Sequence, residues 1–210
     1  MANQRTTGTP AEAGGRTAGE SYTERLATLE QAGLRRFLPT QLPYRTHLRA
    51  LRLGRVLDVG CGLGRNLTHL DGQGVGVDHN PTSVAACRER GLTAFTPDEF
   101  FAGEESTEGR FDALLCAHVL EHIDEPTAAE LFEDYLPCVR PGGRVVLITP
   151  QESGYASDPT HIRFVDFAAL RAHAAGAGIE VERTYSFPFP RATGKAFKYN
   201  EFVLVGRVPQ

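Results

Sequence analysis

Long apolar runs are missing from this sequence. No stretch approaches the roughly 20 consecutive apolar residues that a membrane-spanning helix needs, and residues 1–20 have no apolar core of the kind found in secretory signals. An excess of basic residues is also absent, since the formal net charge is −4 over 210 residues. A negative field repels nucleic acid. We therefore expect a cytoplasmic protein that interacts neither with membranes nor with nucleic acid.

Cysteine pairs with the spacing of a metal site or of a disulfide framework are missing too. The four cysteines stand singly among apolar or small residues, at Cys61, Cys87, Cys116 and Cys138. Free cysteines in such surroundings are usually buried and reduced. We predict four buried thiols and no metal site.

The length suits one domain with a single core. Residues 1–20 are rich in Gly, Thr, Ala and Ser, so they bury too little apolar surface to offset their ordering entropy, and we predict a disordered tail. Residues 21–52 carry apolar side chains at helical spacing, interrupted at Pro39, which predicts an N-terminal helical cap. The main domain is then expected over residues 53–210.

In the main domain, short strands rich in Val, Leu and Ile alternate with helical segments. Such alternation predicts a parallel sheet with helices on both faces, which is a doubly wound α/β fold. The strands are expected at 55–59, 74–77, 92–95, 111–117, 144–149, 179–187 and 201–208, with a turn at 140–143. The helices are expected at 64–70, 81–90, from Pro97 onward, at 126–138 and at 165–176.

The last two expected strands break this rhythm. Only a loop of Pro, Arg, Gly and Lys residues separates 179–187 from 201–208. A parallel pair needs a long crossover connection, so these two strands should pair antiparallel. The predicted sheet therefore has seven strands, mostly parallel, with an antiparallel last strand.

A glycine-rich turn follows the first strand. Its sequence is Gly60-Cys-Gly-Leu-Gly64, and an acidic residue, Asp78, ends the second strand 18 positions after Gly60. Glycines allow the backbone to turn tightly and to approach a ligand closely, and the start of the next helix offers free N–H groups to an anion. A carboxylate at the end of the second strand can accept the two ribose hydroxyls of an adenosine. The pattern predicts a site for an adenosine-containing ligand.

The run Val56-Leu-Asp-Val-Gly-Cys-Gly62 resembles the first motif of the class I S-adenosylmethionine-dependent methyltransferases, especially their small-molecule branch. The segments Ala117-His-Val-Leu-Glu-His122 and Arg140-Pro-Gly-Gly143 are similar to later motifs of that family. The resemblance implies a Rossmann-like fold and S-adenosyl-L-methionine as cofactor. It places the methionine part at the glycine turn and Asp58, the ribose at Asp78, and the adenine near Asp98. The expected cofactor-binding residues are Asp58, Gly60, Cys61, Gly62, Gly64, Asn66, Asp78, His79, Asp98, Glu99, Ala117 and His118.

A dinucleotide is the rival cofactor. Its fingerprint is G-x-G-x-x-G, whereas the glycines here stand at positions 60, 62 and 64. This spacing favours S-adenosylmethionine.

Methyl transfer requires an aligned nucleophile and the exclusion of water, and a general base helps when the acceptor is a hydroxyl or a protonated amine. Two histidines at the expected carboxyl edge of the sheet are candidate bases. His118 follows the fourth strand, and His161 lies in the long connection after the fifth. The alternatives are a packing residue at a helix start for His118 and a solvated loop residue for His161.

Two loops, 151–163 and 186–200, should hang over the same edge and bind the acceptor. The second holds Lys195 and Lys198, the only lysines of the chain, among several aromatic residues. Aromatic and cationic side chains together can bind a ring that bears an acid group. The expected acceptor-binding residues are Tyr22, Tyr44, Tyr155, His161, Arg163, Phe189, Arg191 and Tyr199.

The sequence thus predicts a methyltransferase that acts on an O or N atom of a small molecule, as a monomer or a homodimer. An RNA or protein methyltransferase is the first alternative, although the acidic balance disfavours it. A non-catalytic protein that binds S-adenosylmethionine is the second.

Overall fold

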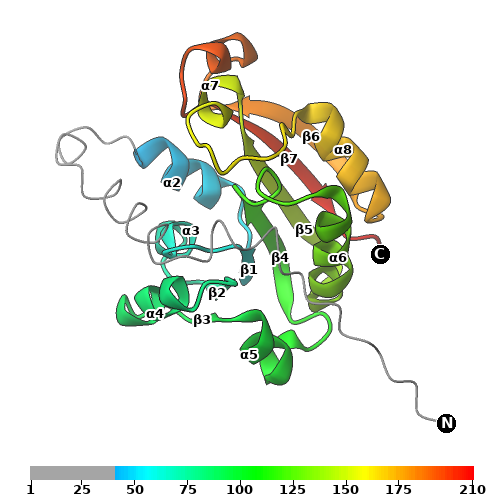
Figure 1. Ribbon diagram of the computed structural model, residues 1–210. Helices are drawn as coiled ribbons and strands as arrows, with labels where there is room; N and C mark the ends of the chain where they lie inside the picture. Colours follow the sequence, from blue (N-terminus) through cyan, green and yellow to red (C-terminus); the bar gives the residue numbers. More distant parts are fainter. Residues whose placement is uncertain (1–40) are drawn as a thin grey trace.

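The computed structural model describes residues 41–210, which form one seven-stranded sheet with helices on both sides (Figure 1). The strand order is β3-β2-β1-β4-β5-β7-β6, so the order reverses beside β1, as in a doubly wound sheet. The expected tail, the first part of the expected cap and Tyr22 lie outside the described residues.

The strands are β1 (Val56–Val59), β2 (Gly74–Val77), β3 (Ala94–Phe95), β4 (Phe111–Ala117), β5 (Val139–Pro150), β6 (Glu180–Phe187) and β7 (Glu201–Arg207). The α-helices are α2 (Leu42–Ala50), α3 (Arg65–His69), α4 (Pro81–Glu89), α5 (Pro97–Ala102), α6 (Glu125–Tyr135), α7 (Glu152–Tyr155) and α8 (Phe167–Gly176). Short 3₁₀ turns are η3 (Glu104–Ser106), η4 (Leu136–Cys138) and η5 (Arg191–Lys195).

The first five strands pair in parallel, and β7 pairs antiparallel with both β5 and β6. The predicted fold class is therefore confirmed, including the antiparallel last strand. Since β7 runs opposite to its neighbours, its first residue, Glu201, pairs with Pro150 and Phe187 at the ends of β5 and β6. The start of β7 consequently lies at the edge where the parallel strands end.

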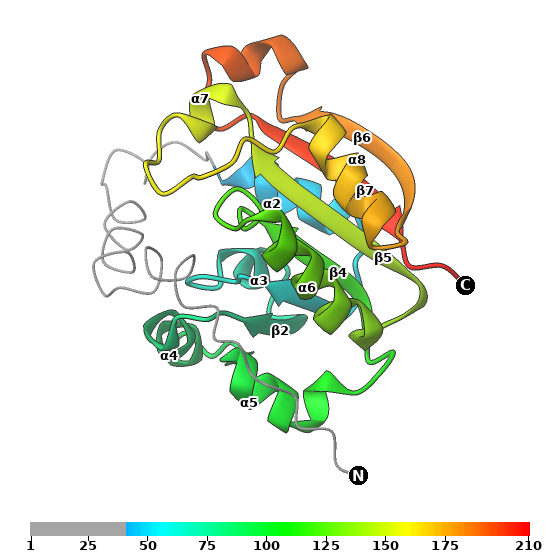
Figure 2. The same cartoon turned by 45° about the vertical axis from the view of Figure 1, so that its right-hand side comes forward.

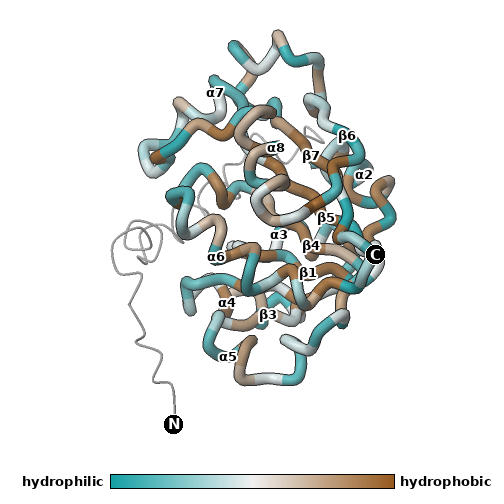
Figure 3. Tube along the Cα trace, turned by 90° about the vertical axis from the view of Figure 1, so that its right-hand side faces the viewer, coloured by the Kyte–Doolittle hydropathy of each residue, from teal (hydrophilic) through white to brown (hydrophobic). Residues whose placement is uncertain are grey.

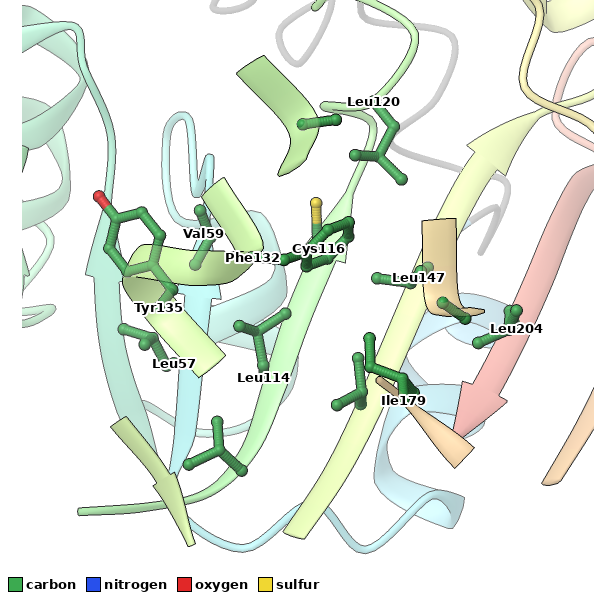
Figure 4. Close-up of a cluster of buried hydrophobic side chains, with 14 of the residues drawn as sticks. Leu57, Val59, Leu114, Cys116, Leu120, Phe132, Tyr135, Leu147, Ile179 and Leu204 are labelled. Carbon is green, nitrogen blue, oxygen red and sulfur yellow. The ribbon is translucent and has the colours of Figure 1, made fainter. Parts of the chain in front are cut away.

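Alternation of side chains along each strand divides the core into two layers. On β4, Leu114 and Cys116 face one layer, and Ala113 and Leu115 face the other. Helices α6 and α8, side by side in Figure 2, close the first layer with side chains such as Phe132. Figure 4 shows these side chains meeting between the helices and the strands. Helix α2 helps to close the second layer, and the most hydrophobic stretches of the trace lie on the central strands (Figure 3).

Two helices near the β2–β3 side begin as their sequences indicate. Asn80 caps α4 by accepting from the Thr82 N–H, with Pro81 in the first turn. Thr96 and Glu99 form a capping box at the start of α5. Both helices therefore start directly after strands that end at the ligand-binding edge.

The structure corrects the expected boundaries of β3 and β5. Strand β3 has only two residues instead of the four expected. Strand β5 begins at Val139, before the expected turn at 140–143, and its register against β4 shifts there. Gly142, with φ +69°, lets the chain bulge within the strand.

All four cysteines are buried and free, as predicted. Within residues 41–210 no helix is both long and apolar enough to cross a membrane.

Replacement of Leu57 by Ala tests the core described here. Leu57 is fully buried on β1, so the lost contacts and the remaining cavity should lower the free energy of unfolding by about 2–5 kcal/mol. Urea titration would measure the change. Leu42→Ala is the matched control, because Leu42 is 52% exposed and its loss should change stability by less than about 0.5 kcal/mol. Equal effects of the two substitutions would contradict the assignment of the core.

Candidate active site

The glycine turn follows β1 and leads into α3. Gly60, Gly62 and Gly64 have φ values of +73°, +53° and +77°, which only glycine adopts readily. A Cβ atom on Gly60 would also lie 2.2 Å from Cγ2 of Val119. The turn thus requires glycine both for its conformation and for the close approach of the segment that follows β4.

The Asp78 carboxylate fastens this turn to the end of β2. Its Oδ2 accepts the Gly62 N–H at 2.8 Å, and its Oδ1 accepts the Asn80 N–H at 2.9 Å. The side chain is 8% exposed. Each carboxylate oxygen has a second lone pair, so Asp78 can still accept from hydroxyl groups of a ligand.

Asp58, on β1 beneath the turn, is fully buried. Its Oδ1 lies 3.5 Å from Nδ2 of Asn66, and its Oδ2 has no hydrogen-bond partner. Burial raises the pKa of Asp58 to about 7, although the contact with Asn66 opposes this rise. An orphaned buried carboxylate oxygen beside the glycine turn fits the ammonium group of a methionine moiety, which would satisfy Asp58 Oδ2.

The other expected cofactor residues lie around this turn or at the ends of β3 and β4. Cys61 packs beneath the turn, where its Sγ approaches the Gly62 carbonyl. His79 is half exposed beside Asp78. Asp98 is exposed in the first turn of α5. Glu99 is already engaged in the capping box and in an ion pair with Arg88 at 2.7 Å.

His118 follows β4 with φ +61°, an uncommon conformation for a residue other than glycine. Its Nδ1 lies 3.2 Å from Oε1 of Glu121, and its Nε2 lies 2.9 Å from Oε1 of Glu201. Desolvation lowers the pKa of His118, but the hydrogen bonds and charges of the two carboxylates outweigh it and raise the pKa to about 9.

A narrow recess with a volume of about 10 Å³ lies next to the glycine turn. It includes four residues that sequence reasoning assigned to the site, namely Tyr44, Asn66, Ala117 and His118. His47, Leu48, Arg65, Ile148 and Glu201 complete the lining.

Sequence reasoning missed His47, Arg65 and Glu201. Glu201 could have been found, because an antiparallel last strand must begin at the ligand-binding edge. No comparable signal in the sequence points to His47, since α2 meets β6 only in the folded chain.

Helix α2 closes one side of the recess through contacts with distant segments. Tyr44 donates a hydrogen bond to the Tyr199 carbonyl. The His47 ring stacks on Phe187 with centroids 4.0 Å apart, and its Nε2 lies 2.6 Å from the Tyr185 hydroxyl oxygen. Helix α2, which belongs to the expected N-terminal cap, is thus held against the carboxyl end of β6 and the residues before β7.

His161 lies away from the recess, near Glu121. Its Nδ1 donates to the Tyr155 carbonyl at 2.7 Å, and its ring stacks on Tyr155. Glu121, His122 and His161 each offer one atom that could ligate a metal, and these three atoms lie within 4.8 Å of one another. Residues of these types can bind divalent metals. The expectation of no metal site therefore stays a prediction.

Most of the residues expected to bind the acceptor lie on the outer loops. Arg163 donates to the Leu120 carbonyl, Arg191 pairs with Glu152, and Phe189 is 48% exposed. The lining of the recess includes none of Tyr155, His161, Arg163, Phe189, Arg191 and Tyr199. The structure therefore places Tyr44 and His118 in the recess beside the glycine turn. The residues predicted on the loops 151–163 and 186–200 lie outside its lining.

Comparisons with known proteins agree with this geometry. The methyltransferase domain family matches residues 22–184. The ubiquinone biosynthesis O-methyltransferase of Xanthomonas oryzae pv. oryzae (strain PXO99A) is 32% identical over 121 residues, covering 53% of this chain and 49% of the relative. The corresponding enzyme of Albidiferax ferrireducens is 30% identical over 126 residues, covering 55% and 48%. The chain spans about half the length of the curated relatives that it matches.

Solved structures share the fold at low sequence identity. A SAM-dependent methyltransferase from Archaeoglobus fulgidus superposes with a TM-score of 0.63 at 17% identity, covering 82% of this chain and 96% of that one. A putative methyltransferase from Haloferax volcanii, solved with the Trm112 activator, has a TM-score of 0.66 at 17% identity, covering 93% and 97%. The [4+2]-cyclase SpnF has a TM-score of 0.56 at 21% identity, covering 74% of both chains.

The family match, the sheet order and the glycine turn point to one assignment. This chain belongs to the class I S-adenosylmethionine-dependent methyltransferases.

Proposed function

We propose that the protein transfers the methyl group of S-adenosylmethionine to an oxygen or nitrogen atom of a small molecule. The observation that carries this proposal is the recess beside the glycine turn, lined by Tyr44, His118 and Glu201. A methyl acceptor has to reach the methyl group from outside the cofactor cradle, and this recess adjoins that cradle at the ends of β4 and β5.

The polarity of the recess supports a compact acceptor. The recess itself has a volume of about 10 Å³, room for about one water molecule, so only the reacting group of an acceptor enters it and the rest of the molecule stays outside. Leu48, Ala117 and Ile148 supply apolar surface, and the other lining residues are polar, charged or aromatic. This mixture suits a compact acceptor with an apolar body and a polar reacting group.

The relatives favour oxygen over nitrogen as the acceptor atom. The curated relatives are named as O-methyltransferases of ubiquinone biosynthesis. By analogy, we propose a hydroxyl acceptor for this chain. The match with the Xanthomonas oryzae relative covers 49% of that relative's length. It therefore supports oxygen as the methylated atom, and it does not identify the acceptor molecule.

S-adenosylmethionine, when bound, supplies a methyl group already activated by a sulfonium. The protein's own residues then have to bind, orient and exclude water. We assign the methionine part to the glycine turn and Asp58, because Asp58 Oδ2 lacks a partner. We assign the ribose to Asp78, which lies at the end of β2.

The first prediction concerns the activity itself. Incubation of the full chain with methyl-labelled S-adenosylmethionine and a panel of phenols and amines should transfer label to an oxygen acceptor. A fold of this kind can also host other chemistry, as the [4+2]-cyclase shows, so transfer has to be measured directly. Failure to bind S-adenosylmethionine at millimolar concentration in calorimetry would refute the proposal.

The second prediction concerns Asp78. Asp78→Asn should weaken S-adenosylmethionine binding by about 10-fold or more, because one charged acceptor for the ribose and for the turn is lost. Isothermal titration calorimetry would give the dissociation constants. Asp134→Asn, at an exposed position on α6, is the matched control and should bind as the wild type does. Unchanged binding by the Asp78 variant would remove Asp78 from the cofactor site.

The third prediction uses the raised pKa of Asp58. Because its pKa rises from 3.8 to about 7 on folding, the folded state holds a proton that the unfolded state releases between these values. Stability of the ligand-free protein should therefore fall as pH rises from about 4 to about 7. At about pH 8, ligand-free Asp58→Asn should be more stable than the wild type by about 1–3 kcal/mol.

The same variant should lose affinity for the cofactor, because the neutral amide cannot pair with the ammonium group. Urea unfolding at several pH values and calorimetry with S-adenosylmethionine would measure the two effects. A variant that loses stability at high pH, or that keeps full affinity, would contradict the role of Asp58.

A further inference from the structure

Glu201 occupies a distinctive place in the recess. It is the first residue of β7, and its Cα partners are Pro150 and Phe187 at the ends of β5 and β6. Only 6% of its surface is exposed, yet it lines the recess. The strand direction therefore places a nearly buried carboxylate where the acceptor is proposed to bind.

Charged and titratable groups surround Glu201 from several elements. Burial raises the pKa of Tyr44, and the negative charge of Glu201 raises it further. The same charge opposes the lowering of the His47 pKa by burial. It also contributes to the raised pKa values of Tyr185 and His118. The groups around it are Tyr44 and His47 on α2, Arg65 at the start of α3, His118 after β4, Arg183 and Tyr185 on β6, and Tyr199 before β7.

His118 is the other polar group at the proposed site of transfer, and both of its ring nitrogens face carboxylates. Nδ1 faces Glu121 at 3.2 Å, and Nε2 faces Glu201 at 2.9 Å. An ionised carboxylate can only accept hydrogen bonds, so both nitrogens have to donate, and only the imidazolium form does this. His118 then has no lone pair with which to take a proton from an acceptor.

We propose that Glu201 takes the proton released by the methyl acceptor, and that His118 is a positively charged positioning residue that holds Glu201 in place. The inference rests on the proposed function and deepens it. The acceptor class that follows is a molecule with an O–H or protonated N–H group at the atom to be methylated. A thioether or a tertiary amine, which has no proton to release, gains nothing from Glu201.

The proton and electron balance is simple. A bond forms between a lone pair of the acceptor atom and the methyl carbon, and the sulfur–methyl bond breaks with its electron pair left on sulfur. The electron pair of the acceptor's O–H or N–H bond stays on the acceptor atom, and the proton goes to a carboxylate oxygen of Glu201. No further reactant is required.

The combined charge of Glu121, His118 and Glu201 favours the transfer of a proton from the acceptor to this group. Two carboxylates and one imidazolium carry one negative charge in excess, so the group becomes neutral when it takes a proton. Glu121 is fully buried, and its Oε2 has no partner. Glu201 is the carboxylate of this group that lines the recess, so it is the one that an acceptor reaches.

Nuclear magnetic resonance can test the charge of His118 without an acceptor. The histidines would be labelled with ¹³C and ¹⁵N, and His118 assigned from the spectrum of His118→Gln. In the wild type we expect an imidazolium signal at neutral pH and a titration midpoint well above that of an ordinary histidine. Glu201→Gln should lower the midpoint. His173 on α8, which faces neither carboxylate, should titrate equally in both proteins.

The second experiment measures turnover with catechol as the probe acceptor and labelled S-adenosylmethionine as the methyl donor. Glu201→Gln should lower kcat by about 100-fold and abolish the decline of the rate at acidic pH, because the carboxylate that takes the proton of the acceptor is lost. His118→Gln should lower kcat by about 10-fold and keep that decline. Glu180→Gln is the matched control, because Glu180 is exposed at the opposite end of β6, and it should behave as the wild type.

The outcomes separate this inference from the proposed function. A neutral His118 at neutral pH in the wild type would overturn the inference, and so would a pH profile that changes in His118→Gln but not in Glu201→Gln. Circular dichroism and S-adenosylmethionine binding would verify that each variant folds, with Glu201→Asp as a more conservative substitute. If catechol is not methylated, the result contradicts the proposed hydroxyl acceptor. The nuclear magnetic resonance experiment then still determines the charge of His118.

Discussion

The carboxylate of Asp78 is the interaction on which the site depends. By accepting the N–H groups of Gly62 and Asn80, it joins the turn after β1 to the end of β2 and to the cap of α4. Asp78 is almost fully buried, so these hydrogen bonds are made in a medium that strengthens them. The glycine turn keeps its left-handed conformation within this frame, and the recess at the ends of β4 and β5 lies against it.

The strands and the glycine turn could be predicted from the sequence, because each is indicated by residues close together in the chain. Strand composition and the start of the helix at Pro97 are recognised within short windows of sequence, and the structure confirms the seven strands, apart from the bounds of β3 and β5, and the start of α5. The walls of the recess could not be predicted in this way. His47 meets Tyr185 across 138 positions of sequence, and no pattern in either segment indicates the other. Loop composition drew attention to Arg191 and Phe189, but Arg191 is paired with Glu152, and Phe189 packs on Phe197 outside the recess.

His118 shows why a residue type alone does not define a chemical role. It follows β4 at the edge where the parallel strands end, and an isolated histidine would titrate close to neutral pH. Glu121, three positions later, and Glu201, on another strand, change its proton affinity through direct contacts. A histidine so placed orients and neutralises its neighbours, and the carboxylates around it become the groups that exchange protons with a ligand.

The contact between Tyr44 and Tyr199 also has a consequence for how the protein assembles. These residues are 155 positions apart, and His118 and Glu201 are 83 apart, so the recess is closed by contacts between segments that are distant in the sequence, and such contacts require the entropic cost of loop closure. During synthesis the cradle from β1 to β4 leaves the ribosome well before β7 does. The recess can therefore close only after the last strand has inserted between β5 and β6.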